Sequence, residues 1–179
     1  MDLALLGGSL RQDSLNLRFL NHLARTLEAM GHPVASMTGE ALRLPLYDAD
    51  LAVPEGVTAL HGALTRVQGL VLVSPEYNAG VPAHLKNAVD WLSTLNPNPL
   101  RGLPVLLGAV SPGAFGGARG LLAWRAILAN LGALAVPAAI TVPLADRNLG
   151  PDGAPTEDRA RMEVQRALEA FLELAHRLA

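Results

Sequence analysis

GLVLVSPEYNAGVPAHLKNAVDWL is the sequence of residues 69–92, and it decides the fold that we expect. Its first five residues are apolar and predict a fully buried strand over 69–73. Polar and ring-bearing residues follow between two prolines, and residues 83–95 then predict an amphipathic helix. In an open α/β sheet, ligands bind outside the carboxyl ends of the strands, so we expect Pro75–Asn78 to form part of a site. The alternative is a proline-bounded turn with Glu76 and Asn78 in solvent.

Length and composition indicate one globular domain over residues 1–179, with 50% hydrophobic and 17% charged residues. A net charge of −2 argues against a nucleic-acid partner or an anionic membrane surface. The absence of cysteine excludes disulfides, thiolate metal sites and a cysteine nucleophile. The chain opens on an apolar strand without a basic leader, and its uncharged stretches are too interrupted to span a membrane. We therefore expect a cytoplasmic protein.

Apolar runs and helical periodicity alternate along the whole chain. The runs predict strands over 3–6, 34–37, 69–73, 103–110 and 133–142. The periodic segments predict five helices: one that ends near Met30, two over 55–67 and 83–95, one that follows Gly120, and one that begins near Thr156. We expect Met30 on the inner face of the first helix and Leu178 on the inner face of the last. Five strands that alternate with five helices predict a parallel sheet with helices on both faces, because apolar strands suit burial on both sides. An open doubly wound sheet with strand order 2-1-3-4-5 fits this length better than a closed barrel.

The loop after the first strand has the chemistry of a phosphate site. A helix N-terminus offers unpaired N–H groups and a partial positive charge. Ser9, Ser14 and Asn16 add short donors, and Arg11 adds a planar cation that can fork onto phosphate oxygens. Alternatively, Ser14 is simply the helix N-cap and Arg11 is solvated. The dinucleotide fingerprint and the P-loop pattern are both absent, so a single terminal phosphate fits best.

The loop after the fourth strand carries Ser111 and three glycines, Gly113, Gly116 and Gly117, which would let backbone approach a flat ligand closely. In the order 2-1-3-4-5, strands one, three and four lie together at the centre of the sheet, so their three loops should converge. The five histidines show no metal-ligand spacing, and no nucleophile elbow is present. We therefore expect no metal and no catalytic side chain, and we infer that a bound cofactor supplies the reactivity.

Three segments resemble the NADPH-dependent FMN reductase family, whose members include quinone, chromate and azo-dye reductases. They are Gly8–Asn16, Pro75–Asn78 with Leu85–Trp91, and Ser111–Gly117. The resemblance implies a flavodoxin-like three-layer sandwich that binds FMN and uses NADPH or NADH as electron donor. It implies a ping-pong reaction, in which the donor delivers hydride to flavin N5, leaves, and is replaced by a small acceptor such as free flavin, a quinone, chromate or an azo compound.

The resemblance also implies the cofactor-binding residues. The phosphate would be held near Ser9, Leu10, Arg11, Ser14 and Asn16; the isoalloxazine ring would lie along Pro75, Glu76, Tyr77 and Asn78, with Ser111, Gly113, Gly116 and Gly117 on its other side. The helix over 83–95 would form the interface of a homodimer or homotetramer. The loops over 38–54 and 144–155 are not diagnostic and would shape the choice of acceptor.

Two other functions fit the same fold. A flavodoxin-type electron carrier would bind FMN without its own NAD(P)H turnover, but such carriers usually have a strongly acidic surface and a phosphate loop without arginine. A flavin-free protein that acts on another phosphorylated metabolite, such as a transferase, is disfavoured because the sequence shows no base, nucleophile or metal site. Steady NAD(P)H consumption with FMN bound would distinguish the reductase from the carrier.

Overall fold

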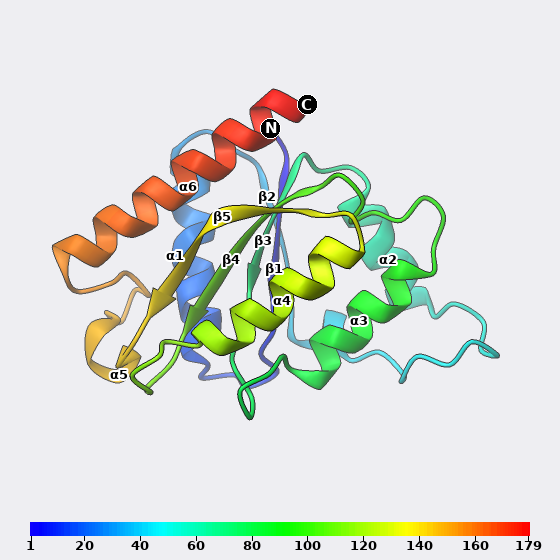
Figure 1. The fold of residues 1–179 in the computed structure, drawn as a ribbon, viewed down its shortest axis with the longest axis horizontal. Helices are drawn as coiled ribbons and strands as arrows, with labels where there is room; N and C mark the ends of the chain where they lie inside the picture. Colours follow the sequence, from blue (N-terminus) through cyan, green and yellow to red (C-terminus); the bar gives the residue numbers. More distant parts are fainter.

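A parallel sheet of five strands runs through the centre of the molecule in a computed structural model that describes residues 1–179 (Figure 1). The predicted strand order is confirmed, since the strands lie in the order β2-β1-β3-β4-β5 and every neighbouring pair is parallel. Their bounds are β1 Leu3–Gly7, β2 Val34–Thr38, β3 Gly69–Val73, β4 Pro104–Val110 and β5 Leu134–Val142. Strands β1, β3 and β4 are buried along their whole length, as their apolar runs predict.

Helices cover both faces of the sheet and complete the three-layer sandwich (Figure 1). Helices α1 and α6 pack on one face, and α2, α3 and α4 pack on the other. The helices are α1 Leu15–Ala29, α2 Glu55–Leu64, α3 Ala83–Ser93, α4 Ala118–Asn130, α5 Ala145–Asn148 and α6 Asp158–Leu178, with a 3-10 turn over Gly39–Leu42. None of these helices combines the length and the apolar character needed to cross a membrane.

Two hydrophobic cores lie on either side of the sheet. Phe19 of α1 and Phe171 of α6 are fully buried in one core, and Trp91 of α3 and Trp124 of α4 are buried in the other. Burial of aromatic side chains of this size is a main source of folding free energy. The predicted inner faces of the helices are therefore correct along most of their length.

The two exceptions lie at helix ends. Met30, the C-cap residue of α1, is 38% exposed, and Leu178, the last residue of α6, is 53% exposed. The prediction that both side chains point inward is therefore wrong. Helical periodicity continues to the last residue of a helix, whereas burial depends on the neighbouring elements, so a terminal apolar residue is covered on fewer sides.

All five strands point the same way, so their carboxyl ends share one edge of the sheet, the lower edge in Figure 1. The loops that follow β1, β3 and β4 leave from this edge, and the loop before α3 projects furthest from it (Figure 1). Both chain termini lie at the opposite edge (Figure 1). The three loops with unusual sequences are thereby brought together.

Candidate functional site

A cavity of about 190 Å³ opens where the loops after β1, β3 and β4 meet. Most of the predicted site residues line it: Ser9, Arg11, Ser14, Asn16, Pro75, Glu76, Tyr77 and Ser111. The predicted residues Leu10, Asn78, Gly113, Gly116 and Gly117 do not line this cavity. Leu15, Val110 and Pro112 line it and were not predicted. Val110 could have been found from the sequence, because it is the last residue of a central strand.

The N-terminus of α1 forms one wall of the cavity. Ser14 is its N-cap, and its hydroxyl oxygen accepts a hydrogen bond from the N–H of Leu17 at 3.3 Å. The hydroxyl oxygen of Ser9 accepts a hydrogen bond from the N–H of Arg11 at 3.3 Å. Both hydroxyl groups are nearly buried and still have a hydrogen to donate, so capping and anion binding are compatible roles for Ser14.

Arg11 supplies a cation that no carboxylate neutralises. Its side chain is exposed at the cavity, and none of the ion pairs in the structure includes it. A guanidinium in this position can turn toward an anion at the α1 N-terminus without breaking another contact. The donor set of two hydroxyls, a helix N-terminus and a free guanidinium fits a phosphate group.

Asn16 has a structural partner at the end of β4. Its side-chain amide donates to the carbonyl of Val110 at 2.9 Å and accepts from the N–H of Val110 at 3.0 Å. The side chain is buried, and the paired bonds fasten the first turn of α1 to the loop that carries Ser111. One N–H of the amide is left over for a ligand.

Glu76 lies at the cavity with its carboxylate on the first turn of α4. One oxygen accepts the backbone N–H groups of Arg119 and Gly120 at 3.0 Å and 3.2 Å, and the other accepts the Nε–H of Arg119 at 2.7 Å. Burial alone would raise the pKa of Glu76, but the hydrogen bonds and charge of Arg119 outweigh it and hold the pKa below its usual value. The carboxylate is therefore ionised at neutral pH, and its contribution to stability is lost only as the pH falls through that lowered pKa.

The glycines after β4 allow close packing of the polypeptide backbone. A Cβ on Gly116 would lie 2.9 Å from the nitrogen of Pro143, and one on Gly117 would lie 2.6 Å from the Cβ of Ala109. Both glycines also have positive φ, at 58° and 90°, which disfavours any other residue. These contacts account for both glycines without a ligand. Gly113 donates its N–H to the Ser111 hydroxyl at 3.0 Å.

A tight turn forms the tip of the loop after β3. Tyr77 and Gly80 exchange both backbone hydrogen bonds, at 3.1 Å and 2.9 Å, and the two residues between them have positive φ, 51° for Asn78 and 61° for Ala79. A turn with positive φ at both central positions favours asparagine followed by glycine. Asn78 satisfies this preference, whereas the Cβ of Ala79 is strained in the left-handed region.

Replacing Ala79 with glycine should therefore stabilise the protein. Relief of the left-handed strain exceeds the entropy that glycine adds to the unfolded chain, so the free energy of unfolding should rise by roughly 0.5–1 kcal/mol. Urea denaturation measures this difference. Ala170→Gly is the matched control, because Ala170 is exposed within α6 and its replacement should lower the free energy of unfolding by about 1 kcal/mol. Equal losses in both variants would contradict the strained turn.

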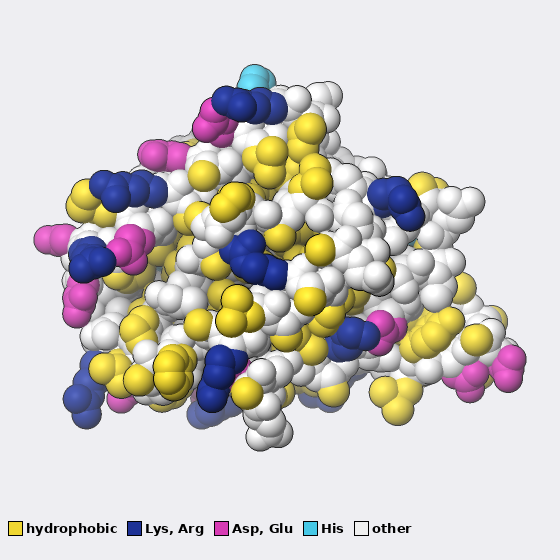
Figure 2. Space-filling view, in the orientation of Figure 1, with side chains coloured by type: hydrophobic (Ala, Val, Ile, Leu, Met, Phe, Trp, Pro, Cys, Tyr) yellow, Lys and Arg dark blue, Asp and Glu magenta, His cyan; other side chains and the backbone are white.

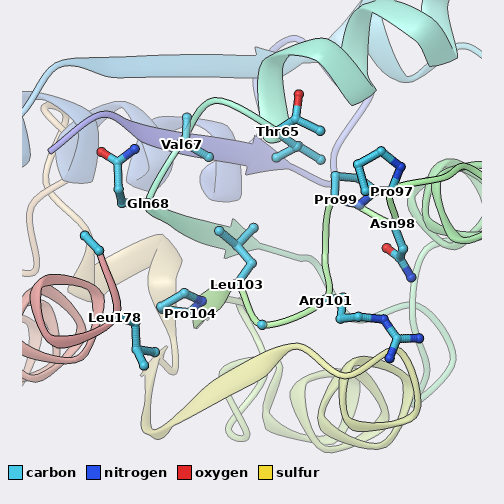
Figure 3. A pocket seen from close by; sticks show the side chains of 13 residues that line it. Thr65, Val67, Gln68, Pro97, Asn98, Pro99, Arg101, Leu103, Pro104 and Leu178 are labelled. Atoms are coloured by element: carbon cyan, nitrogen blue, oxygen red, sulfur yellow. The ribbon is translucent and has the colours of Figure 1, made fainter.

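A larger cavity, of about 330 Å³, lies at the opposite edge of the sheet, between the start of β4 and the end of α6 (Figure 3). Its polar side chains are largely engaged. The side-chain oxygen of Gln68 accepts from the N–H of Asp2, and that of Asn98 accepts from the N–H of Leu100. Arg101 is the exposed cation of this cavity (Figure 3). No converging set of donors comparable to the one at α1 is found there.

Comparison with known proteins identifies the family of this chain. The family model described as NADPH-dependent FMN reductase matches residues 1–146. The chain belongs to this family. A quinone reductase from Escherichia coli K12 is 45% identical over 135 residues, covering 71% of this chain and 69% of that protein. An NAD(P)H-dependent FMN reductase from Pseudomonas aeruginosa is 30% identical over 185 residues, covering 99% of this chain and 97% of that protein.

Solved structures support the same conclusion. FerB, a flavoenzyme NAD(P)H:(acceptor) oxidoreductase from Paracoccus denitrificans, superposes with a TM-score of 0.86 at 27% identity, covering 98% of this chain and 97% of that chain. A flavodoxin from Pseudomonas aeruginosa, with a TM-score of 0.61 at 17% identity, shares the fold. The protein is thus a flavodoxin-like oxidoreductase that uses FMN and a reduced nicotinamide dinucleotide.

Proposed function

We propose that the cavity at the carboxyl edge of the sheet holds FMN by its phosphate at the N-terminus of α1, and that the protein catalyses NAD(P)H-dependent reduction of small acceptors there. The observation that carries this proposal is the donor set around Arg11. Ser9, Ser14 and the α1 N-terminus converge with an arginine that has no other partner.

The remaining predicted site residues have places in this proposal. Asn16 holds the phosphate loop against β4 and offers its one free N–H. Pro75–Tyr77 and Ser111–Pro112 also line the cavity, and the isoalloxazine ring would extend along these two segments. Asn78 and the glycines after Ser111 would support these segments, and Leu10 packs against the core from the phosphate loop.

FMN, when bound, supplies the hydride and electron chemistry, so the protein needs no nucleophile or metal of its own. The chain's residues would bind the phosphate, orient the ring and leave one side of the site open. We propose that donor and acceptor use this open side in turn, which is a ping-pong sequence. Initial rates measured at several fixed quinone concentrations should then give parallel double-reciprocal lines. Intersecting lines would show that both substrates bind together and would contradict the shared site.

Quinones are the acceptor class that we propose. Relatives named quinone reductase support this choice, as does the aromatic side chain of Tyr77, which lines the cavity and is 48% exposed. Flat apolar acceptors would gain contacts with such a ring. Free flavin, chromate and azo compounds are the other candidate acceptors. We also propose a cytoplasmic location, where reduced nicotinamide dinucleotides are generated.

We propose that α3 and α4 form the interface of a homodimer or a homotetramer. A groove of about 410 Å³ lies between them and is lined by Lys86, Asp90, Ser93, Ala126, Ile127, Asn130 and Leu131. Leu122, on the outer side of α4, is 67% exposed. Hydrophobic side chains gather over the face that carries α3 and α4 (Figure 2). Most oligomers are symmetric assemblies of one chain, so a second copy is the partner that we propose for this mixed face of polar and apolar side chains.

Light scattering coupled to gel filtration tests the assembly. We expect a mass of at least twice the 18.8 kDa of one chain. Ala126→Arg should reduce this mass to that of one chain, because it places a large charged side chain at an exposed position that lines the groove. Met162→Arg is the control, since Met162 is exposed on α6 across the sheet and its replacement should leave the mass unchanged. A monomeric wild-type protein would contradict the proposed interface.

A further inference from the structure

Glu76 is the one carboxylate among the residues that line the proposed cofactor site, and it is held by several contacts with α4. Both of its oxygens are occupied by the backbone and side chain of the first turn of α4. Its side chain is only 9% exposed, whereas that of Arg119 is 55% exposed. The three hydrogen bonds and the ion pair with Arg119 occupy most of the acceptor capacity of this carboxylate, although Glu76 lines the cavity.

The loop that carries Glu76 also packs closely on Gly120 of α4. A Cβ on Gly120 would lie 3.4 Å from the Cα of Glu76 and 3.2 Å from the carbonyl oxygen of Gly80. The loop after β3 therefore passes directly over the first turn of α4. A second bond ties the same two elements, since the indole N–H of Trp124 donates to the Ser74 hydroxyl at 2.8 Å within the core.

The contact also changes the charge beside the cavity. The N-termini of two long helices lie at this edge, and each carries a partial positive charge. At α1 the N-terminus faces the cavity with a free arginine, whereas at α4 the carboxylate of Glu76 already occupies the N-terminus and pairs with Arg119. An anion is thus favoured at α1 and not at α4, which fixes the direction in which a phosphorylated ligand lies.

We propose that Glu76 is a positioning residue for the cofactor. Its carboxylate clamps the backbone of Pro75–Tyr77 onto α4 and offsets the positive charge of Arg119 beside the proposed site. Glu76 is thereby a residue that sets the reduction potential of the flavin through Arg119, without binding the flavin itself. This inference rests on the proposed function, because it requires FMN in the cavity.

The two partners of the pair should shift the potential in opposite directions. Glu76→Gln keeps the size of the side chain but leaves Arg119 uncompensated, so reduced FMN, which is more negative, should gain affinity relative to oxidised FMN. We expect a gain of about tenfold, which is about 30 mV for a two-electron couple. Arg119→Gln removes the cation and leaves Glu76 on the helix N-terminus, so the potential should fall. Arg119 is exposed, and this second variant should fold even if the first is unstable.

The experiment is an anaerobic redox titration of bound FMN in wild-type protein and both variants, together with FMN dissociation constants. Glu40→Gln is the matched control, because Glu40 pairs with Arg43 in an exposed contact away from the cavity, and it should change neither quantity. Opposite shifts for Glu76→Gln and Arg119→Gln would support the inference. Shifts of the same sign, or wild-type potentials in both variants, would overturn it. A wild-type protein that binds no FMN would instead refute the proposed function.

Discussion

Replacing Arg11 with alanine is expected to weaken FMN binding roughly 10- to 150-fold. A charge-assisted hydrogen bond to a phosphate contributes about 1.5–3 kcal/mol, and 1.4 kcal/mol corresponds to a factor of ten in affinity. Arg11 has no competing partner in the protein, so its removal should cost little in folding stability. The quenching of FMN fluorescence on titration with protein measures the dissociation constant directly.

Arg101→Ala provides the matched control for this variant. Arg101 is also an exposed arginine beside a cavity, but that cavity lies at the opposite edge of the sheet (Figure 3). Its replacement should leave the affinity for FMN unchanged. An Arg11→Ala protein that binds FMN within twofold of wild type would show that the phosphate lies elsewhere. Equal losses in both variants would indicate a general charge effect and not a specific contact.

Replacing Trp124 with alanine is expected to lower the free energy of unfolding by about 3–5 kcal/mol. Trp124 is fully buried between α4 and the sheet, so its loss leaves a large cavity in the core. Urea denaturation followed by circular dichroism measures the change. Trp91 is the only other tryptophan, so its fluorescence reports on the same transition in the variant.

Trp124→Phe separates packing from hydrogen bonding at this position. Phenylalanine fills most of the space but cannot donate to the Ser74 hydroxyl, so a loss of about 1 kcal/mol is expected from the missing bond. If Trp124→Ala costs less than about 1 kcal/mol, the value typical of an average substitution, the assigned burial of α4 is wrong. The order of the three stabilities, wild type above phenylalanine above alanine, is therefore the expected result.

Much of the fold could be predicted from local patterns. The strand over Gly69–Val73 has the predicted bounds, because a continuous apolar run that ends at a proline-containing loop has few other interpretations. The exposed ends at Met30 and Leu178 could not be predicted, since periodicity does not reveal how far neighbouring elements cover the end of a helix. The short helix α5 and the 3-10 turn were also missed. Helices this short depend on tertiary contacts, not on a pattern of their own.

The candidate site also has a part that could be predicted from the sequence and a part that could not. Ser9, Arg11 and Ser14 could be placed together from the sequence, because they follow one strand and precede one helix. The contact of Glu76 with α4 could not, because its partners lie 43 and 44 residues away and only the packing of two loops brings them close. Likewise, Gly116 and Gly117 suggested room for a ligand, whereas the structure places β4 and β5 against them.

The most direct test of the central claim, that this chain binds FMN and reduces it with NAD(P)H, is an absorbance spectrum of the purified protein. It is recorded after FMN is added, after excess FMN is removed, and again after NADPH is added without oxygen. The structure predicts that a flavin band remains with the protein and then bleaches when NADPH is added. A band that remains but does not bleach would contradict the reductase and favour an electron carrier. A protein that retains no flavin would contradict the cofactor site itself.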